Sequence, residues 1–439
     1  MRIIVSLRLS KWLAVCLALF VLRARADTNF IAGADCSLLK FFEDRGITYK
    51  DNGQTADMLA ILKNHGLTCV RLRVFTSSAA QAKADPYDFT NNLAYTLPLA
   101  IRVKNAGLQL LIDFHYSDTW ADPGNQSMPL AWTNQPLAQL TVLLRDYNSN
   151  CIALLKASNA MPDYVQIGNE ITGGILWPYG QVPGNDATTQ WAQFGQLMKA
   201  AVQGITNAAG TNMPKIIIHI DRGGDWNTTE WFFDNVTSQG IPFDIIGESY
   251  YPWWHGTLSD LSHCLTNAAK RYNRPVIVAE TAFPWNSTYW TTNIIGYTGT
   301  VTGQVAYAIA LAQTVKNVPG GKGAGIFWWG TEYQHKSGVN EAGFNTASFF
   351  DASGNLLPVA DVFGAMAAPV LLDASVTGQN LVFHWPLSGA GMSLTTTTNL
   401  TSAQTWLMVT NQVQNTGTVY NATVPVDAVP NRFFRLKSN

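Results

Sequence analysis

The amino-acid sequence predicts a (β/α)8 barrel followed by a small all-β region, and three observations carry this prediction. Between Asn29 and about Gly364, eight apolar runs of strand length alternate with stretches long enough for one helix each. The runs are continuously apolar, which is typical of parallel strands covered by helices. After about Pro369 the helical pattern disappears. Eight strand–helix units favour the barrel. A doubly wound open sheet is the alternative, but the chain lacks the glycine-rich phosphate loop that would open its first helix.

The expected barrel strands lie at regular intervals along the chain. In order they are Phe30–Asp35, Cys69–Val74, Leu108–His115, Val165–Asn169, Lys215–Asp221, Phe243–Gly247, Pro275–Glu280 and Gly325–Trp329. The segment between the first two shows the helical pattern most clearly. Thr55–His65 has apolar residues at helical spacing and is followed by Gly66, a common helix stop. We therefore expect a helix there and one in each later interval.

The last part of the chain reads as short strands separated by Gly, Asn and Pro. The expected strands are Asn380–Trp385, Gly391–Thr395, Thr405–Val409, Thr418–Tyr420 and Phe433–Leu436. Two tryptophans, Trp385 and Trp406, are either a sugar-binding platform or core residues, and the core is favoured for a small sandwich. We expect a barrel domain over residues 27–368 and an all-β domain of unknown role over residues 369–439.

The N-terminus has the pattern of a secretory signal peptide over residues 1–26. Arg2, Arg8 and Lys11 precede the apolar run Trp12–Leu22, which is too short to span a bilayer. Ala24–Ala26 has the small-x-small pattern of a cleavage site, although Cys16 leaves a lipoprotein as the less favoured alternative. The sequence thus predicts a secreted protein, extracellular or periplasmic, with no membrane-spanning segment.

Composition and cysteines narrow the function classes further. The net charge is −1 and only 13% of the 439 residues are charged, so nothing draws the chain to nucleic acid or to an anionic membrane. Without the signal peptide, four cysteines remain in an oxidising compartment: Cys36, Cys69, Cys151 and Cys264. They allow up to two disulfides, whose pairing stays open. No spacing suggests a zinc site, and we expect a monomer without metal or cofactor.

Two glutamates stand at the ends of expected strands. Tyr164–Glu170 and Arg274–Glu280 are apolar runs that each end in a carboxylate. In a barrel, the carboxyl ends of the strands meet on one face, where catalytic groups lie. A pair of carboxylates delivered to that face is what a retaining glycosidase uses, one to protonate the leaving oxygen and one to attack the anomeric carbon.

An ordered set of motifs resembles the arabinogalactan endo-β-1,4-galactanase family, which belongs to a clan of retaining (β/α)8 glycosidases. The motifs are Gly33–Ser37, Tyr49–Gln54, Val70–Val74, Asp113–Pro123, Gln166–Thr172, Leu176–Pro178, Ile246–Pro252 and Val278–Ala282. The resemblance runs from about Phe30 to Trp329 and leaves out the all-β region. It implies Glu170 as acid/base, Glu280 as nucleophile, and the β-1,4-galactan of plant type I arabinogalactan and pectin as substrate.

Further site residues follow from the expected strand ends and from the resemblance. Arg71 and Arg73 share one face of a strand, and the resemblance favours Arg71 as the group that keeps Glu280 charged. Asn169 is expected to bond the sugar 2-OH, and Tyr250 to bond the nucleophile. The remaining candidates are His115 and His219 near the cleavage point, Trp329 as the floor of that subsite, and Asp118, Trp120 and Asp122 on the third loop, either as sugar contacts or as loop residues. Asp113 and Asp221 are expected to orient other groups.

Some residues depart from the family pattern, and other functions stay open. Glu248 stands where the family has an apolar residue, so a third carboxylate inside the barrel, paired with an arginine, is one expectation. The loop Phe283–Tyr289 has no Asp, so the calcium site of some family members is not expected here. One alternative is a related glycosidase acting on mannan, cellulose or xylan. A non-catalytic carbohydrate-binding protein is another.

Overall fold

The structure is a computed structural model of the chain. It describes residues 5–6, 30–183, 186–287, 293–294, 296–368, 370–389, 392–398, 406–411, 413–416, 419–425 and 432–438. The predicted signal peptide lies outside these ranges except for β1 (Val5–Ser6), which pairs antiparallel with Phe434 and Phe433. Within the described ranges, no helix has both the length and the apolar character needed to cross a bilayer.

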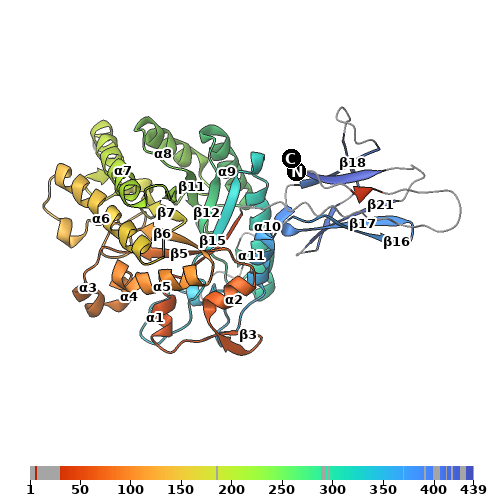
Figure 1. Ribbon diagram of the computed structural model, residues 1–439, viewed down its shortest axis with the longest axis horizontal. Helices are drawn as coiled ribbons and strands as arrows, with labels where there is room; N and C mark the ends of the chain where they lie inside the picture. The colour runs from red at the N-terminus through yellow and green to blue at the C-terminus, as the bar shows by residue number, and fades with distance from the viewer. Residues whose placement is uncertain are drawn as a thin grey trace.

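Eight parallel strands close into a barrel, which confirms the predicted fold class (Figure 1). In barrel order they are β2 (Ile31–Asp35), β5 (Cys69–Val74), β6 (Gln109–Phe114), β7 (Tyr164–Ile167), β10 (Lys215–Ile220), β11 (Ile245–Ser249), β12 (Val276–Thr281) and β15 (Gly323–Trp328). Each overlaps one of the eight strands expected from the sequence. The second strand has the predicted bounds, and the others differ at one or both ends.

Helices surround the barrel and bury the outer faces of its strands. They are α1 (Leu39–Glu43), α2 (Met58–Asn64), α3 (Ala79–Ala84), α4 (Pro86–Phe89), α5 (Leu93–Asn105), α6 (Leu137–Ala157), α7 (Ala187–Ala209), α8 (Trp226–Ser238), α9 (Leu258–Tyr272), α10 (Val301–Lys316) and α11 (Val359–Ala367). The helix expected from Thr55 begins at Met58, because the Asp57 side chain caps it by accepting from the Ala60 amide.

Short elements lie in the connections between the larger elements. They are β3 (Tyr49–Asp51) with β4 (Gln54–Ala56), β8 (Gly174–Ile175) with β9 (Gly180–Gln181), β13 (Asn293–Ile294) with β14 (Tyr297–Thr298), and the 3₁₀ turns η1 (Leu130–Trp132), η2 (Ile171–Gly173), η3 (Pro319–Gly321) and η4 (Phe344–Thr346). The β3–β4 hairpin occupies the residues just before α2, which is the second reason that this helix is shorter than predicted.

The barrel interior changes from apolar to polar along the strands. A cluster of Ile31, Cys69, Leu111, Ile217, Ile245, Ile277, Ala279 and Phe327 fills the end where the strands begin. A Cβ at Gly33 would overlap the ring of Phe327, so a glycine is needed there for this ring to fill the interior. Toward the carboxyl ends, the same strands bury Asp35, Arg71, Asp113, Gln166, His219 and Ser249. The apolar layer thus supports a polar layer above it, where a site can form.

The four cysteines of the described residues are all free and buried, so the disulfides that the sequence allowed are not formed. They lie on different elements: Cys36 follows β2, Cys69 is in β5, Cys151 is in α6 and Cys264 is in α9. Burial raises the pKa of each thiol, which keeps it protonated. Each cysteine is therefore a small core residue, and the even count carried no pairing information.

The C-terminal region forms two antiparallel sheets, as the sequence predicted. One contains β16 (Asp373–Thr377), β17 (Asn380–Pro386), β21 (Val419–Pro425) and β20 (Val413–Asn415); the other contains β1, β22 (Phe433–Ser438), β18 (Met392–Thr397) and β19 (Leu407–Met408). A separate apolar cluster lies between them. Trp385 belongs to it, only 2% exposed and stacked on Tyr420, which confirms the favoured core assignment. Trp406 is half-buried beneath the guanidinium of Arg435.

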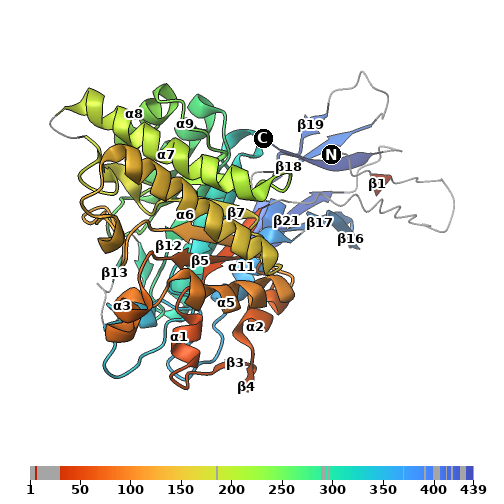
Figure 2. The same cartoon turned by 60° about the vertical axis from the view of Figure 1, so that its left-hand side comes forward.

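The all-β region contacts the barrel at the end where the strands begin. Lys316, at the end of α10, donates to the Ser388 carbonyl in η5 (Leu387–Gly389) and lies over the ring of Phe30, just before β2. Figure 2 shows β16 and β17 on one side of the barrel, with α3 and β13, which follow strand carboxyl ends, on the other. The small domain therefore lies away from the polar end of the barrel.

Candidate active site

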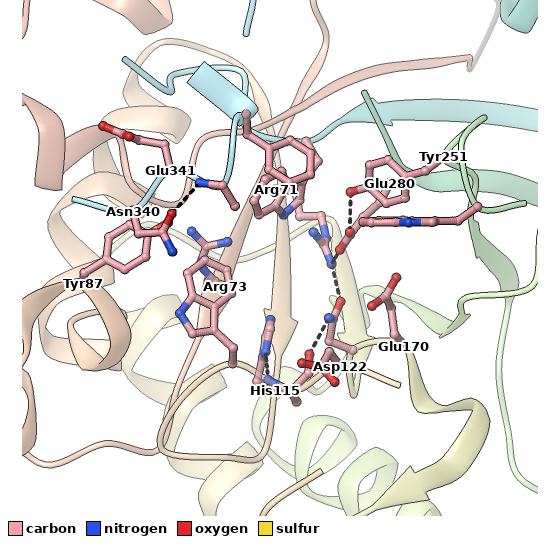
Figure 3. Close-up of a pocket in the computed structure, with 17 residues that line it drawn as sticks. Arg71, Arg73, Tyr87, His115, Asp122, Glu170, Tyr251, Glu280, Asn340 and Glu341 are labelled. Atoms are coloured by element: carbon pink, nitrogen blue, oxygen red, sulfur yellow. Dashed lines mark hydrogen bonds and ion pairs between the residues drawn. The ribbon is translucent and has the colours of Figure 1, made fainter. Parts of the chain in front are cut away.

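The two predicted glutamates lie in one cavity at the carboxyl ends of the strands (Figure 3). Glu170 follows β7, and Glu280 is the fifth residue of β12. The cavity has a volume of about 330 Å³. It is lined by Arg71, Arg73, Tyr87, His115, Trp120, Ala121, Asp122, Asn169, Glu170, Tyr251, Trp254, Glu280, Trp329, Asn340, Glu341, Ala342 and Phe344.

Glu280 is held as an oriented carboxylate by one cation and one hydroxyl. Its Oε1 lies 2.9 Å from Arg71 Nη2, and its Oε2 accepts from the Tyr251 hydroxyl at 2.9 Å. Burial raises the pKa of Glu280, and the Arg71 charge and the Tyr251 hydrogen bond act against that rise. Both contacts favour the ionised form, which is the form that can attack carbon.

Arg71 joins Glu280 to the floor of the site. Its Nη1 donates to Asp35 at 2.8 Å, and its Nη2 donates to Asp113 at 2.8 Å and to Asn169 Oδ1 at 2.7 Å. The side chain is 1% exposed, and its two terminal nitrogens are bonded to these protein groups. The guanidinium stays charged at any working pH. One buried cation therefore contacts both Glu280 and Asn169 through the same nitrogen.

Glu170 has the opposite environment, which favours its protonated form. Burial raises its pKa strongly, and the charges of Glu280 and Asp221 add to the rise, while a hydrogen bond of 2.6 Å from Ser249 Oγ to Oε1 lowers it. Its backbone is left-handed, with φ 49° and ψ 51°, which is strained for a residue with a side chain. A neutral carboxyl poised beside an ionised one is the pairing that general acid catalysis requires.

The strained turn at Glu170 is fixed from both sides. Gln126 Nε2 donates to the Asn169 carbonyl at 2.8 Å, and Asn169 Nδ2 donates to the Ala121 carbonyl at 2.8 Å. On the other side, Thr172 Oγ1 donates to Asp221 Oδ1 at 2.5 Å. The loop after β6 and Asp221, the residue after β10, therefore contact the chain on either side of Glu170.

Comparison with known proteins agrees with this geometry. The family model described as glycosyl hydrolase family 53 matches residues 31–363. The chain belongs to glycosyl hydrolase family 53. It is 34% identical over 342 residues to an arabinogalactan endo-β-1,4-galactanase of Thermothelomyces thermophilus, with 75% of this chain and 98% of the relative covered. It is also 42% identical over 316 residues to an uncharacterised protein of Niallia circulans, with 69% and 84% covered.

Solved structures of this family have the same fold. The glycosyl hydrolase family 53 catalytic domain of Ignisphaera aggregans superposes with a TM-score of 0.69 at 33% identity, covering 77% of this chain and 96% of that one. A structure from a study of two fungal β-1,4-galactanases gives a TM-score of 0.66 at 32% identity, covering 76% and 98%. The resemblance seen in the sequence motifs is confirmed, and the protein is a glycoside hydrolase.

The structure corrects the prediction for Tyr250 in this family 53 site. The hydroxyl of Tyr250 donates to the Gly256 carbonyl at 2.9 Å, and Tyr251 takes the place beside Glu280. The pairing of β11 with β12 shifts between Glu248 and Ser249, so that Ser249 lies opposite Glu280. A shift of one residue exchanges the faces of a strand, and sequence alternation alone does not reveal it.

The two predicted histidines have different roles. His115 lines the cavity; its Nδ1 accepts from the Ala121 amide and its Nε2 donates to Asp113. His219 is fully buried below the cavity and bonds Gln166 and Ser249. Burial lowers the pKa of both, so both are neutral. His219 thus reaches Glu170 through Ser249, while both ring nitrogens of His115 are bonded to protein groups.

Some residues of the third loop line the cavity, and others hold neighbouring loops in place. Trp120 lines the cavity and carries the Arg73 guanidinium over its ring at 3.9 Å, and Asp122 lines it as well. Asp118 accepts from Thr76, Gln81 and the Leu130 amide, and it orders the loops without reaching the cavity. Trp329 lines the cavity as predicted, packed against Phe344 with ring centres 4.2 Å apart.

Glu248 does not enter the barrel. It lies between β11 and α8, where its carboxyl accepts from the Thr229 hydroxyl at 3.0 Å and from the Arg222 amide at 3.1 Å. Burial raises its pKa well above the ordinary value, so it is a neutral structural group. The expectation of an arginine ion pair inside the barrel is therefore wrong.

Several lining residues were missed: Asn340 and Glu341 come from the loop after β15, and Tyr87 comes from the single-turn helix α4. Figure 3 shows Tyr87, Asn340 and Glu341 on the side of the cavity opposite Glu170. Arg73 also lines the cavity. Its side chain is 1% exposed and, among the described residues, its Nη2 has no hydrogen-bond partner. In the described ranges no group of three His, Cys, Asp or Glu side chains forms a metal-binding arrangement.

Proposed function

We propose that the protein is a secreted endo-β-1,4-galactanase that hydrolyses galactan with retention of configuration. The observation that carries this proposal is the opposite environment of the two carboxyl groups in one cavity. Glu280 faces Arg71 and Tyr251, whereas burial and neighbouring carboxylates keep Glu170 protonated. We assign the catalytic unit to residues 27–368, behind a signal peptide over residues 1–26.

The reaction takes two steps at these groups. Glu280 attacks the anomeric carbon while Glu170 gives its proton to the departing glycosidic oxygen, so a glycosyl ester forms and the leaving sugar departs as a neutral alcohol. Glu170, now ionised, takes a proton from water, and the water oxygen displaces Glu280 from the anomeric carbon. Glu170 ends protonated and Glu280 ends ionised, so each turnover consumes one water molecule. Asn169 is placed beside both groups to bond the sugar 2-OH.

The substrate assignment rests on the family and on the shape of the cavity. The relatives with a named activity are arabinogalactan endo-β-1,4-galactanases, and this chain belongs to the same family. The leaving group lies on the side of the acid, so the sugars retained by the enzyme extend toward Tyr87, Asn340 and Glu341. Trp120 and Trp329 supply apolar ring faces there. Plant type I arabinogalactan and pectin side chains carry the β-1,4-galactan that we assign as substrate.

Reducing-sugar release from purified β-1,4-galactan tests this function, with carboxymethyl cellulose and galactomannan in parallel. We expect short oligosaccharides from galactan alone, and no release from any polymer with Glu280→Gln. Proton NMR of early products should show the β-anomer first. Activity confined to another polymer would change the substrate assignment to that polymer. An α-anomer as the first product would overturn the double-displacement mechanism.

A further inference from the structure

The all-β region carries a polar hollow on the solvent face of its first sheet. The hollow is lined by Asn380, Asn411, Gln414, Asn421, Thr423 and Pro425, from β17, β20, β21 and the segment before β20. The opposite faces of β17 and β21 bury Leu381, Phe383, Ala422 and Val424 in the domain core. The alternation of a two-faced sheet therefore puts the hollow on the side that meets solvent.

The lining side chains are of the kind that bind the hydroxyl groups of a ligand. Four of the six side chains are amides, and each amide offers both a donor and an acceptor. Sugar hydroxyls also donate and accept, so amides match them in either direction. No charged side chain is among the described residues that line the hollow, which disfavours phosphate and uronate ligands. The ring of Pro425 adds an apolar edge.

Two of the amides are already oriented by the protein. Asn421, which lines the hollow, has its Oδ1 2.6 Å from His384 Nδ1, which leaves its Nδ2 as a donor. Asn411 Nδ2 donates to the Thr423 carbonyl at 2.7 Å, which leaves its Oδ1 as an acceptor. An ordinary solvated sheet face has mobile polar side chains, whereas a fixed donor and a fixed acceptor in one concavity lower the entropic cost of binding.

We propose that this hollow is a carbohydrate-binding site for an uncharged polysaccharide, separate from the catalytic cavity. The small domain contacts the barrel through Ser388 and Lys316 at the end where the strands begin, and the cavity lies at the other end (Figure 2). The hollow therefore does not extend the cavity. It anchors the enzyme to the polymer network while the barrel cleaves a chain elsewhere.

The test compares full-length variants in native gels that contain soluble polysaccharide. The background is Glu280→Gln, so that the polymer survives, and the protein is made in a bacterium, so that the Asn421 sequon stays unmodified. The hollow variant is Asn380→Ala with Gln414→Ala and Asn421→Ala. The matched control is Asp373→Asn with Ser375→Ala, on the outer face of β16. The polymers are β-1,4-galactan, arabinan and xyloglucan, with polygalacturonate as the charged comparison.

We expect at least one neutral polymer to retard the parent and the control equally, and the hollow variant to need about tenfold more polymer for the same retardation, as the loss of two or three hydrogen bonds implies. Polygalacturonate should retard the hollow variant as much as it retards the parent and the control. Thermal unfolding and turnover by the same substitutions in the active chain should be unchanged. Equal retardation of hollow variant and parent on every neutral polymer, or no retardation at all, would overturn the proposal. Either result leaves the turnover test of the barrel unaffected.

Discussion

Adjacent tyrosines offer a sharp test of how the nucleophile is held. Tyr251→Phe removes the donor that lies 2.9 Å from Glu280 Oε2, and Tyr250→Phe removes a donor to the Gly256 carbonyl. A buried hydrogen bond to a charged group is worth about 1.5–3 kcal/mol, and one to a neutral carbonyl about 1 kcal/mol. If the first contact persists in the transition state, its loss lowers kcat/KM about tenfold to hundredfold.

The same substitution has a signed effect on pH dependence. The Tyr251 hydroxyl lowers the pKa of Glu280, so its removal raises that pKa. The nucleophile must be ionised, and the acidic limb of the kcat/KM profile should therefore move to higher pH. Tyr250→Phe should leave the profile in place and lower only the free energy of unfolding. The assay is kcat/KM on soluble galactan from pH 3 to 9, beside thermal unfolding. Equal loss of activity in both variants, or an unmoved acidic limb in Tyr251→Phe, would refute the assignment.

Three further predictions concern the other groups. Ser249→Ala removes a hydrogen bond that lowers the pKa of Glu170, so the alkaline limb of the kcat/KM profile should move to higher pH, and an unmoved limb would contradict the role of Ser249. Glu170→Gln should be inactive on galactan, and its stability relative to the parent should rise with pH. A carboxyl whose pKa is raised in the folded state destabilises the parent from about pH 4 upward, so the variant should match the parent near pH 4 and unfold at a higher temperature near pH 7. Equal unfolding temperatures of variant and parent across this pH range would argue against a raised pKa of Glu170. Arg71→Met leaves Asp35, Asp113 and Glu280 without their cation and should lower the free energy of unfolding by about 3–5 kcal/mol in urea, whereas a change below 1 kcal/mol would contradict its central place.

The sequence predicted the parts of the fold that depend on repeated patterns. Continuous apolar runs identified all eight barrel strands, because helices cover their outer faces and a packed layer fills the interior. The rule that strand carboxyl ends meet on one face then placed Glu170 and Glu280 together without any knowledge of their contacts. Residues two apart on a strand share a face, which gave Arg71 and Arg73 as candidates for the cation beside Glu280, and the family resemblance favoured Arg71.

The errors have local physical causes that a single sequence does not display. Tyr250 was expected beside Glu280, but Tyr251 occupies that place, because the register shift beside Ser249 leaves no mark in the apolar pattern. A position for Glu248 inside the barrel, paired with an arginine, was one expectation, but its carboxyl is satisfied outside the barrel by Thr229 and the Arg222 amide. The loop residues Asn340 and Glu341 belong to the cavity only through the folded path of the chain after β15.

The roles of the two carboxyl groups are the central claim, and covalent trapping tests them most directly. An activated 2-deoxy-2-fluoro β-galactoside slows both steps of a double displacement but leaves the intermediate to accumulate on the nucleophile. Mass spectrometry of the digested protein should then find one added fluorogalactosyl group on the peptide that contains Glu280, and none in Glu280→Gln. A label on the peptide that contains Glu170, or full inactivation without any label at Glu280, would contradict the account.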